Sequence, residues 1–369
     1  MSTLFQILAY ALRAKTVVGK RLSSRVRGAA QRRSRFYKDV WSEAAGVLGA
    51  SCELLDNDVC RLRRNGASTQ VRNNFTSLDD PDTFRFVNDK PRVHATLSSH
   101  GLPVPPYVEF TLNDLRPAHE FLAHHGRCVV KPAAGTGGGA GVTTGVESRR
   151  HFFLAAVRAA GYGPRLLMEP QLDGDVVRLL YLDGQLLDAV KRSPPSVLSD
   201  GKSKVSQLVR RLNETRLQAG YELSQVMVLH DLEMKRTLAS QGLSWQSVPG
   251  EGQRVMLKRV TNDNMAEDNE SVHDQVAEAV IVAGRHAAEA LGVRLAGVDV
   301  LTPDYRQGLE AVGGVILEVN MAPGYHYHYF TRTGGRPVAV DVLKACLDEA
   351  TSPPRQEAVP AKVERAREG

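Results

Sequence analysis

The sequence predicts an α+β fold with mostly antiparallel sheets, and three observations support this class. Helix and strand signals alternate along most of the chain. Two strand-like runs, residues 176–181 and 185–190, are separated by Asp183-Gly184, a dipeptide typical of the tight turn between antiparallel strands. The chain has 369 residues, which exceeds one ordinary hydrophobic core and is enough for two or three compact lobes.

Hydrophobic periodicity and turn residues set the expected boundaries of the elements. Asp80 and Pro81 are typical of a helix N-cap and a first helical position. Residues 57–58 predict a turn between two short strands, and Gly66 and Ser68 indicate a break after them. The expected helices are 37–48, 91–100, 151–159, 204–213, 229–241, 272–291 and 338–350. Besides the hairpin, the expected strands are 53–55, 59–62, 128–131, 166–169, 298–301 and 315–319.

The charge is distributed unevenly. Residues 1–38 carry ten Lys and Arg and no acidic residue, whereas the other 37 basic residues face 41 acidic ones and give the rest of the chain a net charge of −4. This basic N-terminal arm is compatible with a solvated helix, with a contact to an anionic partner, membrane surface or acidic peptide, or with a targeting segment. It contains few aromatic residues, so we expect no nucleic-acid partner.

The cysteines and the hydropathy favour a cytoplasmic protein. The four cysteines are far apart and include no C-x-x-C pair, which predicts neither a zinc site nor a disulfide framework. We find no apolar run of the length that a transmembrane helix requires. We also expect a homo-oligomer.

A glycine-rich segment follows one of the predicted strands. The sequence VVKPAAGTGGGAGV begins at Val129, places Lys131 at the strand end and continues into glycines 135, 137, 138, 139 and 141. Glycines let backbone N–H groups close around phosphate oxygens, and a lysine adds a positive charge. The segment is neither a Walker loop nor a dinucleotide-binding fingerprint. A flexible hairpin is the alternative.

A second motif carries oxygen ligands at the ends of two apolar strands. In GVILEVNMAPG, which begins at Gly314, Glu318 and Asn320 are two residues apart and therefore share one face of a strand. Asp299 occupies a similar position on the preceding strand. Mg²⁺ prefers such oxygen donors and commonly shares them with substrate phosphates. These side chains could alternatively cap turns.

Together these segments resemble the ATP-grasp superfamily, and most of all the ATP-grasp module of cyanophycin synthetase and bifunctional glutathione synthetase. The segments that carry the resemblance span roughly residues 85–348 and occur in the family's order. They are NDK followed by GLPVPP, VVKPAAGTGGGAGV, MEPQLDGDVVRLLYLDGQLLDAVKRSPPSVLSDGKSKVSQLV, LASQGLSWQSVPGEGQRVMLKRVTNDN, LGVRLAGVDVL and GGVILEVNMAPG.

The resemblance implies two α+β lobes that clamp a nucleotide, preceded by a small N-terminal domain. The expected organisation is a basic arm at 1–38, a small α/β region at 39–85, an ATP-grasp domain at 86–350 with its lid at about 120–175, and a disordered tail at 351–369.

The resemblance also implies the roles of individual residues. Lys90 and Lys131 would bind phosphates together with Gly135, Gly137, Gly138 and Gly139, and Glu169, Gln171 and Leu172 would surround the adenine. Arg178 and Arg192 would hold the substrate carboxylate or acyl phosphate, and Arg178 or Arg259 would stabilise an oxyanion. Asp299, Glu318 and Asn320 would hold Mg²⁺, with Mn²⁺ as an alternative.

Two positions depart from the family pattern. The acid expected two residues after Gly174 is replaced by Val176, which makes Asp175 the candidate for the ribose contact. The loop 261–269 is acidic and amide-rich, which indicates altered substrate recognition.

The stretch 325–330, rich in Tyr and His, could either pack a lobe or form a substrate-side wall.

The activity these residues imply is ATP-dependent ligation of a carboxylate to an amine through an acyl phosphate, with release of ADP and phosphate. Small molecules such as amino acids or short peptides are the expected substrates. An alternative is a peptide- or protein-modifying ligase whose basic arm captures an acidic substrate, and another is a non-catalytic nucleotide-binding protein.

Overall fold

The computed structural model describes residues 24–56, 58–135, 139–218, 230–261 and 266–351, besides the isolated positions 7 and 11. Within this part of the chain, no helix is both long and apolar enough to cross a membrane. Of the tail predicted at 351–369, Thr351 ends a helix and the other residues lie outside the described part of the chain, as does most of the basic arm.

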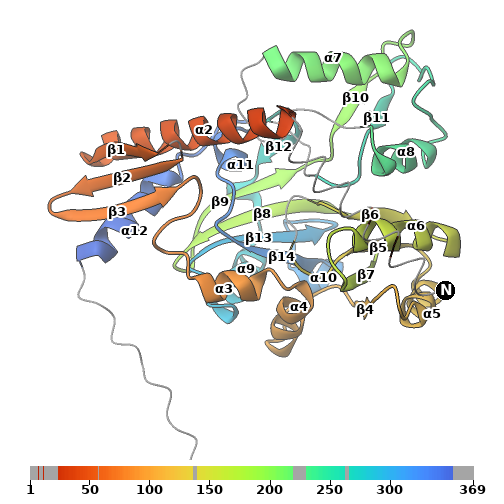
Figure 1. Cartoon of the computed structure of the whole chain (residues 1–369), viewed down its shortest axis with the longest axis horizontal. Helices are drawn as coiled ribbons and strands as arrows, with labels where there is room; N and C mark the ends of the chain where they lie inside the picture. Colours follow the sequence, from red (N-terminus) through yellow and green to blue (C-terminus); the bar gives the residue numbers. More distant parts are fainter. Residues whose placement is uncertain are drawn as a thin grey trace, which may run out of the picture.

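A five-stranded antiparallel sheet forms the centre of the molecule (Figure 1). Its strands, in spatial order, are β12 (Asn269–Ser271), β9 (Gln185–Arg192), β8 (Asp175–Leu182), β13 (Leu295–Thr302) and β14 (Val315–Met321). The β8–β9 hairpin confirms the turn predicted at Asp183, whose φ is 47°. The antiparallel pairing confirms the predicted fold class.

Helices cover both faces of this sheet. Side chains alternate along β8, so they contribute to a hydrophobic core on each face. Leu179 and Tyr181 pack on one side beneath α3 (Pro81–Val87), α4 (Lys90–Ser99) and α9 (Glu278–Ala290). Leu180 and Leu182 pack on the other side with helices from the two ends of the chain. The expected helix 272–291 is wrong at its start: a 3₁₀ turn, η2 (His273–Gln275), precedes α9.

A four-stranded antiparallel sheet, with order β4-β7-β5-β6, forms a second lobe with its own core. It comprises β4 (Val108–Phe110), β5 (Cys128–Pro132), β6 (Thr143–Val146) and β7 (Leu166–Pro170), with α5 (Arg116–His125) and α6 (Arg149–Ala160). The glycine-rich segment therefore connects two neighbouring strands, β5 and β6, of this sheet.

The N-terminal region contains a helix and a three-stranded sheet. Helix α2 (Ser24–Leu48) precedes β1 (Ser51–Asp56), β2 (Val59–Arg64) and β3 (Ala67–Arg72). The predicted β1–β2 pair is confirmed, whereas β3 was not expected. The helix runs without interruption past residue 38, where the sequence suggested a boundary. Its Phe36, Tyr37 and Trp41 share a core with α12 (Ala339–Thr351).

A smaller unit is formed by the chain segment that follows β9 and precedes β12 in sequence. It contains β10 (Ser196–Leu198), α7 (Val205–Gln218), α8 (Leu232–Ala239) and β11 (Arg254–Met256), which share a fourth apolar cluster. Figure 1 shows this unit beside the four-stranded lobe. The remaining short elements are η1 (Ala266–Asp268), α10 (Leu309–Val312) and α11 (His326–Tyr329).

Candidate active site

Three charged residues lie in register across the central sheet. Strand β13 places Asp299 opposite Arg178 of β8 and opposite Glu318 of β14. The Arg178 guanidinium donates to both oxygens of Asp299, with Nε–Oδ1 at 2.6 Å and Nη2–Oδ2 at 2.7 Å. Such a bidentate pair fixes both side chains.

Arg192 reaches the same carboxylate from β9. Its Nη1 lies 3.6 Å from Oδ2 of Asp299, and the Arg178, Arg192 and Asp299 residues are 5%, 4% and 6% exposed. Burial opposes ionisation of Asp299, but the charge and hydrogen bonds of Arg178, followed by the charge of Arg192, outweigh it and lower its pKa below the usual value. The site thus holds one ionised acid between two buried cations.

The other two predicted metal ligands lie beside this pair. Glu318 is 3.4 Å from Nζ of Lys90. The side-chain amide of Asn320 lies 3.5 Å from Asp299 Oδ2 and 3.4 Å from the Gly297 carbonyl. Gly297 is required here, since a Cβ would lie 3.0 Å from Arg178 Nη1 and 2.8 Å from Pro323 Cβ. The structure therefore brings Asp299, Glu318 and Asn320 together.

Their donor chemistry fits Mg²⁺, because two carboxylates and one amide offer only oxygen ligands and leave positions for phosphate oxygens. Among the described residues no three His, Cys, Asp or Glu side chains gather as a metal cluster. The predicted set contains two such residues and an Asn, so it is consistent with this finding.

The two predicted phosphate-binding lysines lie on different lobes. Lys90 is the first residue of α4, capped by Asp89, and its backbone N–H donates to the Ala133 carbonyl at the end of β5. Lys131 is buried in β5, and its Nζ is 2.7 Å from Oε1 of Glu169 on β7. Glu169, expected beside the adenine, is therefore paired with a lysine in this structure.

His94 lies one turn after Lys90 on α4, and its Nδ1 is 3.7 Å from Glu169 Oε1. Burial is the main cause of the lowered pKa of this imidazole, and the negative charge of Glu169 only partly offsets it. The sequence contained a signal for His94, because residues four apart share a helix face.

The glycine-rich segment is partly described. Gly135 and Gly139 have φ values of 73° and 68°, which favour glycine. Gly141 has φ of 81°, and a Cβ there would lie 2.8 Å from the Pro132 ring. Gly137 and Gly138 lie outside the described residues, so their phosphate-binding role stays a prediction.

The segment after β7 contains the predicted adenine and ribose contacts. The Gln171 backbone N–H donates to the Arg127 carbonyl at 2.8 Å, and its side-chain oxygen accepts from the Gly145 N–H at 2.6 Å. Leu172 is half-buried. Asp175 begins β8 and forms an ion pair with Lys191 at 2.7 Å.

A buried acid that sequence reasoning missed joins the four-stranded lobe to the smaller unit. Glu233 of α8 accepts hydrogen bonds from Thr144 Oγ1 at 2.7 Å, from Thr144 N at 3.2 Å and from Arg259 N at 3.4 Å. Nothing in the local pattern of α8 indicates this role, because Thr144 is 89 residues away in sequence. Arg259 is thereby held through its backbone. Among the described contacts, none joins its guanidinium to Arg178 or Asp299.

The ends of the amide-rich loop 261–269 lie at Arg192. Arg192 Nη2 donates to the Thr261 carbonyl at 3.3 Å, and Asn269 pairs with Arg192 across β12 and β9. Residues 262–265 lie outside the described part of the chain. The loop expected to select substrate is thus anchored beside an arginine expected to bind it.

The structure divides the aromatic stretch 325–330 into two roles. Tyr325 is fully buried, and its backbone N–H donates to the Tyr37 hydroxyl at 3.1 Å. The Tyr327 ring instead faces the arginines, with its centroid 4.0 Å from the Arg192 guanidinium carbon. His328 is buried and bonded to Asp188 at 2.8 Å. Packing explains most of this stretch, and Tyr327 is the side chain that contacts the site.

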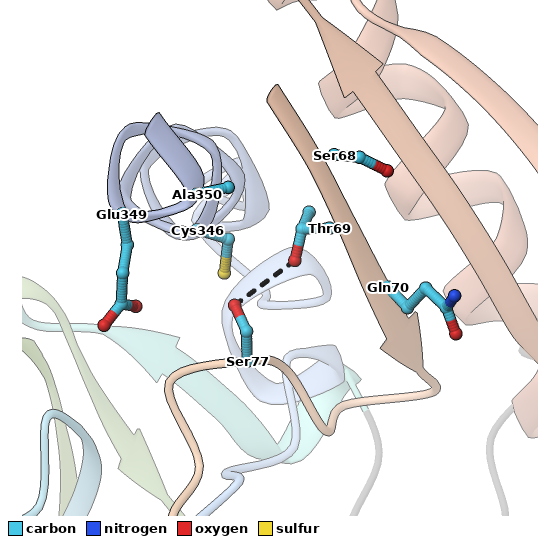
Figure 2. Close-up of a pocket in the computed structure, with 7 residues that line it drawn as sticks. All are labelled: Ser68, Thr69, Gln70, Ser77, Cys346, Glu349 and Ala350. Carbon is cyan, nitrogen blue, oxygen red and sulfur yellow. Dashed lines mark hydrogen bonds between the residues drawn. The ribbon is translucent and has the colours of Figure 1, made fainter. Parts of the chain in front are cut away.

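A separate pocket lies in the N-terminal region between β3 and α12. Figure 2 shows its lining residues: Ser68, Thr69, Gln70, Ser77, Cys346, Glu349 and Ala350. Its volume is about 290 Å³, and the Thr69 and Ser77 hydroxyls hydrogen-bond each other at 3.2 Å. Burial raises the pKa of the Cys346 thiol, which disfavours the thiolate. None of the predicted site residues lines this pocket.

The sequence and the structure of the chain are similar to those of known proteins. The chain is 31% identical over 315 residues to the glutathione biosynthesis bifunctional protein GshAB of Enterococcus faecalis, covering 82% of the chain and 41% of that protein. It is 28% identical over 247 residues to cyanophycin synthetase of Nostoc sp., covering 65% and 27%. No family model matches the chain.

Among solved structures, the bifunctional glutathione synthetase from Pasteurella multocida superimposes with a TM-score of 0.54 at 26% identity, covering 82% of this chain and 42% of that one. The chain has the ATP-grasp fold and is related to the ATP-grasp ligases. Within that class its relatives include GshAB and cyanophycin synthetase. The chain spans less than half the length of these relatives.

Proposed function

We propose that this chain is an ATP-dependent carboxylate–amine ligase that forms an amide or peptide bond through an acyl phosphate and releases ADP and phosphate. The observation that carries the proposal is the row of Arg178, Asp299 and Glu318 across the central sheet, in which Arg178 and Asp299 are buried and Glu318 is half-buried, with the buried Arg192 beside it. This row combines metal-binding oxygens with cations that suit a carboxylate substrate.

The two lysines and the glycine-rich segment would bind the nucleotide. Lys90 and Lys131 lie near Glu318 and Glu169, so binding of phosphates would exchange these carboxylate partners for phosphate oxygens. Asp299, Glu318 and Asn320 would hold Mg²⁺, which when bound neutralises charge on the transferred phosphoryl group. Mn²⁺ offers the same coordination chemistry.

The arginines would orient the acid that is activated. A carboxylate is a poor electrophile, because expulsion of oxide is prohibitive, and phosphorylation supplies a leaving group. The forked guanidinium of Arg178 or Arg192 would align the carboxylate oxygen with the γ-phosphate. The amine then attacks the carbonyl carbon, and the same cations stabilise the oxyanion until phosphate leaves.

Transfer of labelled oxygen tests this proposal. Purified protein is incubated with ATP, Mg²⁺ and pooled amino acids and short peptides whose carboxylates carry ¹⁸O, and the phosphate is analysed by mass spectrometry. We expect ADP, an amide product and one ¹⁸O in the released phosphate. Lys131→Ala should abolish turnover, and the exposed Lys344→Ala should not. Amide formation with unlabelled phosphate, or bound ATP without ADP release for any pair, would contradict the proposal.

A peptide- or protein-modifying ligase is the second candidate, and the position of α2 favours it. This helix includes the last part of the basic arm, and its Phe36 packs against Tyr329 of α11 and the adjacent Phe330. Removal of residues 1–38 would delete the buried Phe36 and Tyr37, so the informative truncation removes residues 1–23. It should raise KM for an acidic peptide and leave small-molecule turnover intact. An unchanged KM for the peptide would exclude this role.

A further inference from the structure

His94 lies where the central sheet meets the four-stranded lobe, and the proposed mechanism gives it no role. Its helix, α4, packs into the core of the central sheet through Val93 and Leu97. The imidazole is 1% exposed, and its Nδ1 lies 3.7 Å from Oε1 of Glu169 on β7, in the other lobe. This side chain therefore connects the two lobes at the carboxylate that is expected beside the adenine.

One hydrogen bond fixes which nitrogen of the neutral imidazole carries the proton. Nε2 of His94 lies 3.2 Å from the carbonyl oxygen of Leu317 on β14. A carbonyl oxygen only accepts, so Nε2 must donate, and Nδ1 of the neutral ring is left as an acceptor. Oε1 of Glu169 is also an acceptor, and both atoms lack a hydrogen bond among the described residues. A proton on Nδ1 would join these two facing acceptors by a charge-assisted hydrogen bond.

Lys131 supplies the positive charge beside Glu169 in this structure. Its Nζ lies 2.7 Å from the same Oε1 as an ion pair, although the two groups are not aligned as a hydrogen bond. The proposed function requires this lysine to turn to phosphate oxygens when ATP binds. Glu169, which is 4% exposed, would then be a buried carboxylate without its cation, and such a charge is strongly unfavourable unless another group compensates it.

The surroundings of His94 make it the group that can replace the lysine. Among the described residues, those that act on the imidazole are Lys90 on α4, Lys131 on β5, Glu169 on β7, the Leu317 carbonyl on β14 and the ring of Tyr107, whose centroid is 5.4 Å away. Burial is the largest cause of the lowered pKa of His94, and both lysines lower it further, whereas Glu169 raises it. Phosphates bound to the lysines would cancel the lysine contributions and leave that of Glu169.

We propose that His94 is a positioning residue for the carboxylate that recognises adenine. When ATP draws Lys131 to its phosphates, Nδ1 of His94 takes up a proton from solvent and donates a hydrogen bond to Glu169. The carboxylate thereby stays ionised and directed at the exocyclic amino group of adenine. Nucleotide binding is then coupled to the uptake of a proton between the lobes. This inference rests on the proposed function.

Calorimetry of nucleotide binding measures this proton uptake. ATP with excess Mg²⁺ is titrated into the full chain at pH 7.5, without a carboxylate substrate, in Pipes, Hepes and Tris buffers. The slope of the binding enthalpy against the ionisation enthalpy of the buffer equals the number of protons taken up. We expect about 0.5–1 proton for wild type, none for His94→Gln, and the wild-type value for His286→Gln, which changes an exposed histidine on α9. Phosphates held by lysines stay deprotonated, so the nucleotide does not supply this uptake.

Competition between purine nucleotides measures the positioning itself. Guanine carries a carbonyl oxygen where adenine carries its amino group, so a correctly directed carboxylate disfavours GTP. We expect His94→Gln to lower the ratio of ATP to GTP affinity roughly tenfold in protein that retains its melting temperature. His94→Asn, whose amide can donate from the position of Nδ1, should retain part of the ratio without taking up a proton.

The wild-type enthalpies decide the inference even if the variants fail to fold. A binding enthalpy that does not depend on the buffer would overturn it, as would the wild-type slope in His94→Gln protein. ATP binding with proton uptake, but with no amide product from any pair of substrates, would support the role of His94 and count against the ligase. Absence of ATP binding would overturn both proposals.

Discussion

The buried Glu233 carboxylate should control how firmly the end of the glycine-rich segment is held. The change we consider is Glu233→Gln, which preserves volume and replaces one acceptor oxygen by an NH₂ group. Glu233 is 2% exposed and accepts from Thr144 N and Oγ1 and from Arg259 N. An amide can satisfy the donors on one side only, so one buried N–H or O–H loses its acceptor.

The size of the effect follows from the number of donors left without a partner. One buried donor deprived of its acceptor costs about 1–3 kcal/mol, and each 1.36 kcal/mol is a factor of ten in an opening equilibrium. Hydrogen exchange of the Thr144 amide should therefore accelerate roughly 5- to 150-fold. We also expect KM for ATP to rise, because Thr144 follows the glycine-rich segment and the next residue, Gly145, donates to the Gln171 side chain.

Hydrogen exchange with mass spectrometry on a peptide spanning residues 142–147 measures this directly. Glu214→Gln, on the exposed side of α7 in the same unit, is the matched control and should leave exchange unchanged. Exchange within twofold of wild type in Glu233→Gln would refute the reasoning, since it would show that the carboxylate does not hold β6.

Three further predictions concern the buried ionisable groups. Lys131→Met should leave Glu169 buried without its cation and lower the free energy of unfolding by about 3–5 kcal/mol, and adding Glu169→Gln should restore urea resistance without restoring turnover. Asp299→Asn should lower turnover at least about a hundredfold and abolish the effect of Mg²⁺ on ATP affinity in calorimetry. Burial lowers the pKa of His328 below 6.5, although its hydrogen bond to the Asp188 carboxylate opposes this shift. The unfolded chain therefore takes up this proton at a higher pH than the folded one, and stability falls as pH drops below about 6.5. Urea midpoints at pH 7.5 and 5.5 should show this, and the slope should weaken in His328→Gln and not in the exposed His286→Gln.

The sequence was most informative about relations between residues that are close together in the chain. Glu318 and Asn320 could be assigned to one face from their spacing, and the hairpin around Asp183 fixed how β8 and β9 pair. The sequence predicted Asp299 at the end of an apolar strand, whereas it lies inside β13, and its bidentate partner could not be predicted. The pairing with Arg178 depends on the register between β8 and β13, which the linear pattern does not specify.

The contacts that prediction missed connect segments far apart in the chain. Glu233 reaches Thr144, and Asn74 reaches Ala322 across 248 positions. Neither residue has a local signature, because its role arises only from packing between lobes. The start of α9 was misjudged for a related reason: apolar Val272 and Val276 fit helical spacing but are buried by a 3₁₀ turn.

The row formed by Arg178, Asp299 and Glu318 has a consequence for how such an enzyme could diversify. These residues are fixed by the hydrogen-bond ladder of a sheet buried on both faces, where a shift of one residue would move each side chain to the opposite face. The loop 261–269 is attached to this frame at Arg192 by its ends. We therefore predict that replacement of residues 262–265 changes substrate preference while Arg178, Asp299 and Glu318 keep their positions. Exchange of that loop between related enzymes would test whether it sets specificity.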